Sequence, residues 1–171
     1  MIPRIISFYS DIESNNYYSD HGKRLIKECE DLDLRYEISE KKSMGNYRLN
    51  CLSKPKYILD KLDEFQEDLL WLDADSKLHK VPVGFDKIET DLAFSTANGN
   101  LSGMKASPLF FKNNDKSRMF LNTWIKSVKN LLENDISKFD HEPLFQLIPL
   151  FLNNNTITMS FVGEEYCRWP G

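Results

Sequence analysis

Four apolar residues run directly into two closely spaced carboxylates in the stretch Leu69-Leu70-Trp71-Leu72-Asp73-Ala74-Asp75-Ser76. The apolar part predicts a strand that is buried on both faces, as in a parallel sheet. The carboxylates then lie at the C-terminal end of this strand, where open α/β sheets bind their ligands. Because side chains alternate along an extended strand, Asp73 and Asp75 are expected to point the same way. Two like charges this close repel each other unless a cation lies between them, which favours a divalent, oxygen-seeking ion such as Mg2+ or Mn2+.

Strands and helices are expected to alternate on the N-terminal side of this stretch. The predicted elements are strands at 4–9 and 34–38, a helix at 20–31 capped by Asp20, an irregular segment at 39–50 and a helix that starts at 53–55. On the C-terminal side we expect strands at 91–95, 107–111 and 156–162 and helices at 115–132 and 142–152. The alternation predicts a parallel α/β sheet in the first half, and the less regular second half predicts mixed pairing. At 171 residues, the chain is expected to form a single domain over 1–171, with a mostly parallel central sheet flanked by helices.

Charge and cysteine content argue against several classes of partner and location. The formal net charge of -4 gives no general attraction to nucleic acid or to an anionic membrane. The three cysteines, Cys29, Cys51 and Cys167, are far apart and form no CxxC pair, which is typical of reduced thiols in the cytoplasm. Acidic residues follow the N-terminus too soon for a signal peptide, and the longest apolar stretch, 144–152, is too short to cross a bilayer. We therefore expect a cytoplasmic protein with no transmembrane segment and no nucleic-acid partner.

The acidic pair at the end of the strand has three interpretations. The two carboxylates could simply face water in a turn. They could form an aspartyl phosphatase site, in which Asp73 attacks phosphorus and Asp75 handles the proton. A position on the third predicted strand rather than the first, with no later GDxxxD acidic pair, counts against this second interpretation. The third interpretation is a metal clamp on a nucleoside diphosphate.

The residues around the acidic pair carry a family resemblance. Lys54-Pro55-Lys56-Tyr57-Ile58-Leu59, a helix, Leu70-Trp71-Leu72-Asp73-Ala74-Asp75 and then Val81-Pro82 resemble the GT-A-fold glycosyltransferases with a DxD motif, a class of nucleotide-diphospho-sugar transferases. The similarity extends to Ser102-Gly103, to 108–111, to Trp124 and to Asp140-His141, so that it covers residues 5–152. It implies a GT-A-like, Rossmann-like domain.

For the acidic pair, the resemblance implies a nucleoside-diphosphate sugar whose diphosphate is bridged by Mn2+ or Mg2+. Asp73 and Asp75 would be the metal ligands, and Asp73 would also contact the donor. Such a metal stabilises the negative charge that grows on the leaving diphosphate. The resemblance also places Lys54 at the donor phosphates. The alternative for Lys54 is a solvated lysine at the start of a helix.

The resemblance implies further donor contacts at the end of the first strand, where Ser7, Tyr9 and Asp11 would hold the base and the ribose. Tyr9 would stack on the base, or else pack in the core. The resemblance also implies that Asp140 and His141 are the catalytic pair that reaches the sugar or the acceptor. His141 replaces the glutamine or glutamate of related enzymes, so it could act as a general base or a metal ligand. The alternative for Asp140 is a cap on the helix that follows.

The sequence thus predicts a metal-dependent glycosyltransferase that moves a sugar from a nucleoside-diphosphate donor to a glycan, lipid or protein acceptor. The alternative is a non-catalytic nucleotide-sugar-binding or interaction module on the same fold, and the less favoured one is an aspartyl phosphatase. Glycosyltransferases of this fold usually carry more chain after the DxD motif. A partner subunit that completes the acceptor side is therefore among the expected partners.

Overall fold

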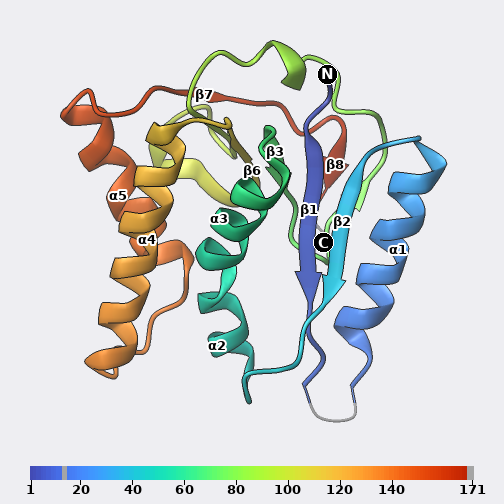
Figure 1. Ribbon diagram of the computed structural model, residues 1–171, viewed down its shortest axis with the longest axis horizontal. Helices are drawn as coiled ribbons and strands as arrows, with labels where there is room; N and C mark the ends of the chain where they lie inside the picture. Colours follow the sequence, from blue (N-terminus) through green and yellow to red (C-terminus); the bar gives the residue numbers. More distant parts are fainter. Residues whose placement is uncertain (13–14, 169–171) are drawn as a thin grey trace.

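A six-stranded sheet forms the centre of the computed structural model, which describes residues 1–12 and 15–168 (Figure 1). Its strands are β1 (Arg4–Tyr9), β2 (Tyr36–Glu40), β3 (Leu69–Trp71), β5 (Leu92–Thr96), β6 (Met104–Phe111) and β7 (Met159–Phe161), in the order β2-β1-β3-β6-β5-β7. β1 is parallel to β2 and β3, β6 is antiparallel to β3 and β5, and β7 is parallel to β5. The predicted α/β fold, parallel in the first half and mixed in the second, is confirmed.

Helices cover both faces of this sheet (Figure 1). α1 (Tyr17–Asp31) packs on one face, and α2 (Tyr47–Leu52), α3 (Lys54–Phe65), α4 (Asp115–Glu133) and α5 (His141–Asn153) pack on the other. β3 and the residue that follows it contribute to both cores, because Leu69 and Trp71 belong to the core of α3 and α4, whereas Leu70 and Leu72 belong to the core of α1. All four side chains are at most 2% exposed. The prediction of a strand buried on both faces is confirmed.

Several short elements escaped the sequence analysis. β4 (Lys77–Leu78) and β8 (Cys167–Arg168) form a separate antiparallel pair, and η1 (Phe85–Lys87) and η2 (Leu101–Gly103) are single 3-10 turns. In the part of the chain that the structure describes, no helix is both long enough and apolar enough to cross a bilayer.

The predicted start of the first helix is wrong. α1 begins at Tyr17, three residues before Asp20, which lies in its first turn. The backbone N–H of Ser19 donates to Oδ1 of Asp11 at 2.9 Å, so an upstream carboxylate serves the helix start that Asp20 was expected to cap. The irregular segment predicted at 39–50 is also partly wrong, because α2 begins there with Asn46 as its N-cap. β2 lies two residues later than predicted.

The predicted geometry of the acidic pair also needs correction. β3 ends at Trp71, and the backbone N–H of Ser76 donates to the carbonyl of Asp73 at 2.9 Å, which closes a turn. Asp73 and Asp75 therefore lie in this turn, residues 73–76, and not on an extended strand. Strand alternation does not orient them, so their arrangement has to be taken from the cavity that they line.

Candidate functional site

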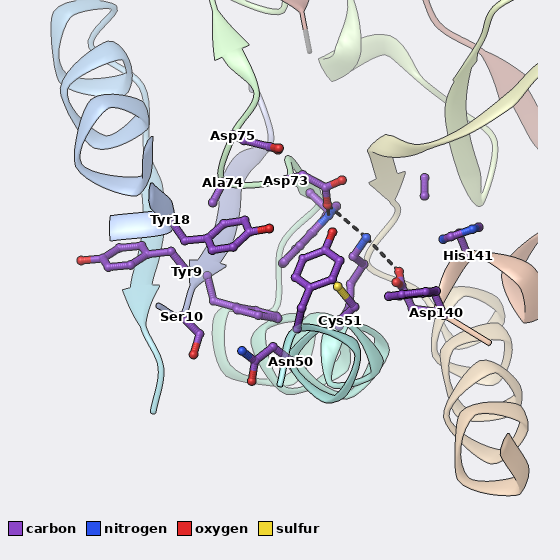
Figure 2. Close-up of a pocket in the computed structure, with 16 residues that line it drawn as sticks. Tyr9, Ser10, Tyr18, Asn50, Cys51, Asp73, Ala74, Asp75, Asp140 and His141 are labelled. Atoms are coloured by element: carbon purple, nitrogen blue, oxygen red, sulfur yellow. Dashed lines mark hydrogen bonds and ion pairs between the residues drawn. The ribbon is translucent and has the colours of Figure 1, made fainter. Parts of the chain in front are cut away.

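A cavity of about 320 Å3 opens at the C-terminal ends of β1 and β3, at the sheet edge where the acidic pair was expected (Figure 2). It is built from the end of β1, the start of α1, the helices α2 and α3, the turn after β3 and the start of α5. Its lining residues are Phe8, Tyr9, Ser10, Tyr18, Tyr47, Asn50, Cys51, Lys54, Trp71, Asp73, Ala74, Asp75, Ala106, Phe139, Asp140 and His141.

A buried lysine lies between two carboxylates in this cavity. Nζ of Lys54 is 3.0 Å from Oδ1 of Asp73 and 2.8 Å from Oδ2 of Asp140 (Figure 2). The side chains of Lys54 and Asp140 are only 7% and 4% exposed. Burial disfavours the charge of the lysine, but the two carboxylates more than offset this and raise the pKa of Lys54. Lys54 is therefore a charged, buried bridge and not the solvated lysine of the alternative interpretation.

Hydrogen bonds hold both carboxylates in place. Nε1 of Trp71 donates to Oδ1 of Asp73 at 2.8 Å, and the backbone N–H of Asp73 donates to Oγ of Ser107 at 2.9 Å. Nε1 of Trp124 donates to the backbone carbonyl of Asp140 at 2.8 Å. Asp140 has the N-cap position of α5, but its side chain makes no capping hydrogen bond. This carboxylate thus serves the lysine rather than the helix.

Asp75 is the third carboxylate of the cavity (Figure 2). It is half-buried, and this burial, followed by the negative charge of Asp73, raises the pKa of its carboxyl group. The ionised form of Asp75 is therefore held at a cost in free energy that a nearby cation would relieve.

α1 fixes the acidic turn through Arg24. Nη2 of Arg24 donates to the carbonyls of Asp75 and Ser76, at 3.0 and 2.7 Å, and its Nε forms an ion pair with Glu28 at 3.2 Å. Glu28 in turn accepts a hydrogen bond from the backbone N–H of Leu78 at 2.8 Å. The turn is thus tied to α1 on one side and to the sheet on the other.

We expect Arg24→Met to lower the free energy of unfolding by about 1–3 kcal/mol, because two carbonyls of the acidic turn lose their charged donor. Urea unfolding measures the change. Lys27→Met is the matched control on the same helix, since it removes an exposed lysine whose ion pair with Asp31 is screened by water, and it should leave the midpoint unchanged. Equal midpoints for the two variants would contradict a clamp by Arg24.

Comparison with known proteins identifies the fold of the chain. No protein-family model and no curated protein matches the sequence. Among solved structures, a glycosyltransferase involved in the glycosylation of the major capsid of PBCV-1 is similar, with a TM-score of 0.64 and 11% identity over 95% of this chain and 82% of that one. The glycosyltransferase GlyE of Streptococcus pneumoniae TIGR4 is similar, with a TM-score of 0.63 and 14% identity over 96% of this chain. The apo form of GlyE has a TM-score of 0.62 and 15% identity over 97% of this chain. The chain has a glycosyltransferase fold. It spans 46% of the length of GlyE, and at such low identities the likeness carries the fold and leaves the activity to be argued from the site.

Within this glycosyltransferase fold, most of the predicted site residues meet in one place. Those that line the cavity are Tyr9, Lys54, Asp73, Asp75, Asp140 and His141. Ser7 and Asp11 are not among the described residues that line it. Ser7 is fully buried in β1, and its carbonyl accepts a hydrogen bond from the hydroxyl of Tyr57 at 2.9 Å. For Asp11, burial opposes ionisation, but the hydrogen bonds from Ser19 prevail and lower its pKa, in keeping with its place at the start of α1.

The ring of Tyr9 packs beneath α1. A Cβ added at Gly22 would lie 2.1 Å from Cδ1 of Tyr9, so it is the glycine that lets the helix approach the ring. The side chain of Tyr9 is 8% exposed and shares a core with Leu25 and Cys29. Most of the Tyr9 ring is therefore packed in the core, which was the alternative to stacking on a base.

An aromatic wall of Tyr18, Tyr47, Phe139 and His141 lines the cavity, and sequence analysis found only its histidine. The rings of Tyr18 and Tyr47 stack with their centroids 5.7 Å apart and an angle of 14° between their planes. Phe139 lies 5.8 Å from Tyr47 and stacks on His141 at 6.0 Å and 12°. Burial raises the pKa of Tyr18, and the charge of Asp75 adds to this, so both tyrosines are neutral hydrogen-bonding groups at neutral pH. The sequence signal for these rings is weak, since they lie near helix starts or in a loop, far apart in the chain.

Cys51 also lines the cavity, and it is a free thiol, as are Cys29 and Cys167. Burial, followed by the charge of Asp140, raises the pKa of Cys51 to about 11. The thiolate is the reactive form of cysteine, so the neutral thiol of Cys51 is a poor nucleophile near pH 7. The chemistry of the cavity therefore depends on its carboxylates, lysine and histidine.

Proposed function

We propose that this chain is a glycosyltransferase that binds a nucleoside-diphosphate sugar through Mn2+ or Mg2+ held by Asp73 and Asp75. The observation that carries the proposal is the charge of the cavity. Its described lining residues include three carboxylates, from Asp73, Asp75 and Asp140, and one ammonium group, from Lys54. One divalent cation would balance this excess of two negative charges. The cavity also lies at the edge of the sheet where this type of fold binds its ligands.

The available donor groups fit a cation that arrives together with phosphate. Among the residues that the structure describes, no group of three or more His, Cys, Asp and Glu side chains could enclose a metal ion. Magnesium sites that bind phosphorylated substrates commonly use one or two protein carboxylates, with phosphate oxygens and water as the other ligands. Trp71 and Lys54 both contact Oδ1 of Asp73, so Oδ2 is the oxygen that we assign to the cation. When bound, the cation would neutralise charge that develops on the leaving diphosphate.

Lys54 has a positioning role in this proposal. Its ammonium group is already shared by Asp73 and Asp140, and it cannot move to a phosphate without leaving a buried carboxylate unpaired. We therefore assign Lys54 to holding Asp140 at the cavity, where this carboxylate would accept hydrogen bonds from the hydroxyl groups of the donor sugar.

His141 is the proposed proton acceptor. Figure 2 shows it beyond Asp140, on the opposite side of the cavity from Tyr18, and its side chain is 44% exposed. The acceptor hydroxyl oxygen would bond to the anomeric carbon while the bond from this carbon to the diphosphate breaks and its electron pair stays on the diphosphate. The hydroxyl proton would pass to the imidazole ring of His141, which would act as the general base.

The nucleobase requires a different aromatic partner from the one that the sequence predicts. Because Tyr9 packs under α1, we assign base stacking to Tyr18, which Tyr47 supports from behind. Ser10 and Asn50 also line the cavity and would supply polar side chains for the base or ribose.

We expect a thermal-shift screen to identify the donor. One nucleoside-diphosphate sugar should raise the melting temperature by roughly 5–10 °C in the presence of Mn2+ and at about 100 times its Kd, because a ligand that binds only the folded state stabilises it. EDTA should remove the shift. Release of free nucleoside diphosphate, by transfer to an acceptor or to water, is then measured with the same sugar nucleotide.

The two measurements separate the candidate functions. No shift with any sugar nucleotide would contradict the proposal. A shift without release of diphosphate would identify the alternative, a binding module on the same fold. A shift with release of diphosphate supports a glycosyltransferase.

A further inference from the structure

A second hollow, of about 360 Å3, adjoins the cavity described above. Its described lining residues are Lys105, Ala106, His141 and Phe145. Ala106 and His141 also line the first cavity, so the two spaces adjoin at these residues. Two ligands bound in the two spaces would meet at His141.

Aromatic rings form one side of the second hollow. His141 and Phe145 lie one turn apart on α5, with their ring centroids 5.7 Å apart and their planes inclined by 50°. Phe139 stacks on His141 and supports its ring. Exposed aromatic faces backed by packed neighbours give a rigid apolar surface, and ligand sites typically combine such a surface with a few polar groups.

Lys105 supplies a polar group to the second hollow. Its Nζ lies 2.7 Å from Oε2 of Glu164, and these side chains are 30% and 32% exposed. Because Glu164 pairs with this lysine, the rim offers a hydrogen-bond donor without a net charge. Such a rim suits a ligand with many hydroxyl groups and no charge of its own.

We propose that the second hollow binds a neutral glycan as the acceptor substrate. A sugar ring has an apolar face of C–H groups for Phe145 and His141, and hydroxyl groups at its edge for Lys105, whose charge Glu164 balances. A lipid tail requires a longer apolar channel than one phenylalanine and one alanine provide. This inference rests on the proposed function, because it makes His141 the group at which donor and acceptor meet.

Binding to a printed array of oligosaccharides tests the inference. The labelled protein is applied with Mn2+ and a nucleoside diphosphate. This is the nucleoside diphosphate of the sugar nucleotide that gives the largest thermal shift. We expect wild type to retain neutral oligosaccharides and Phe145→Ala to bind them at least ten-fold more weakly. Leu150→Ala is the matched control, because it shortens an exposed apolar side chain on the same helix, and it should bind as wild type does.

Two further measurements keep failure of this inference distinct from failure of the proposed function. Lys105→Ala changes the rim without removing core packing, and it should also weaken retention of the glycans. Both variants should keep the thermal shift given by nucleoside diphosphate and Mn2+. If that shift is present but wild type retains no glycan, or if Phe145→Ala and Lys105→Ala both bind as Leu150→Ala does, the glycan subsite is wrong. Absence of the shift in wild type would instead contradict the proposed function.

Discussion

Replacing Lys54 by methionine is expected to lower the free energy of unfolding by about 3–5 kcal/mol. The variant keeps most of the volume of the side chain, so the loss comes from charge rather than from packing. Asp140, at 4% exposure, and Asp73, at 20%, would then face each other without the cation that now lies 2.8 and 3.0 Å from them. Urea unfolding at pH 7 measures the change.

Two further variants show whether charge is the cause. Lys56→Met removes the same charge from the same helix at a side chain that is 64% exposed, and it should leave stability unchanged. The double variant Lys54→Met/Asp140→Asn should recover part of the loss, because one of the two carboxylates is gone. A loss equal to that of Lys56→Met would show that the buried bridge contributes nothing.

The sequence predicted the parts of the site that are close together in the chain. Leu69, Leu70, Trp71 and Leu72 are all buried because neighbouring positions of β3 face opposite cores, and a continuous apolar run is what such a strand requires. Lys54 is the first residue of α3, with Pro55 behind it as a helix-start signal. These local rules placed the acidic pair at the sheet edge and predicted the helix start, and the family resemblance placed Lys54 beside the pair.

Contacts between distant parts of the chain were not accessible in this way. The ion pair of Lys54 with Asp140 joins α3 to the start of α5, and no periodicity reports such a pairing. Asp11 presents a further difficulty, because a carboxylate that accepts a backbone N–H at a helix start is chemically the same as one that accepts a ribose hydroxyl. β4 and β8 contain two residues each, which is too few for any alternating pattern to be visible.

The turn after β3 shows how two carboxylates can lie at the expected sheet edge although the geometric reason given for it was wrong. Strand alternation was expected to align Asp73 and Asp75, whereas a turn closed by Ser76 and held by Arg24 places them at the cavity. Asp73 and Asp75 directly follow β3, so they lie at the edge of the sheet whether the chain stays extended or turns. Their spacing, with one residue between them, was informative because the chain reverses at this point.

Replacing Asp75 by asparagine is expected to abolish the Mn2+-dependent thermal shift and to lower transfer activity by about 100-fold or more. The same variant should be at least as stable as wild type without ligand at pH 7. Burial and the charge of Asp73 raise the pKa of Asp75 above its ordinary value of 3.8, so its ionised form costs free energy in the folded state. Thermal unfolding with and without Mn2+ and the sugar nucleotide measures both effects.

The pH dependence follows from the direction of this shift. A group whose pKa is raised in the folded protein favours folding when it is protonated, and it loses that contribution as the pH rises through its folded-state pKa. The advantage of Asp75→Asn over wild type should therefore be largest near neutral pH and should vanish as the pH falls toward 3.8. Asp135→Asn, in the exposed connection between α4 and α5, removes the same charge elsewhere and should change neither the thermal shift nor its pH dependence.

Opposite effects on stability and on ligand binding distinguish a binding role from a structural one. Replacing a carboxylate that stabilises the fold would destabilise the protein, as is expected for the partners of Lys54. A carboxylate kept for a cation is a strained group in the ligand-free protein, and its removal relieves repulsion while it abolishes binding. If Asp75→Asn keeps the full Mn2+-dependent shift, Asp75 does not hold the cation. Asp73 and Asp140, the remaining carboxylates among the described residues that line the cavity, would then be replaced next.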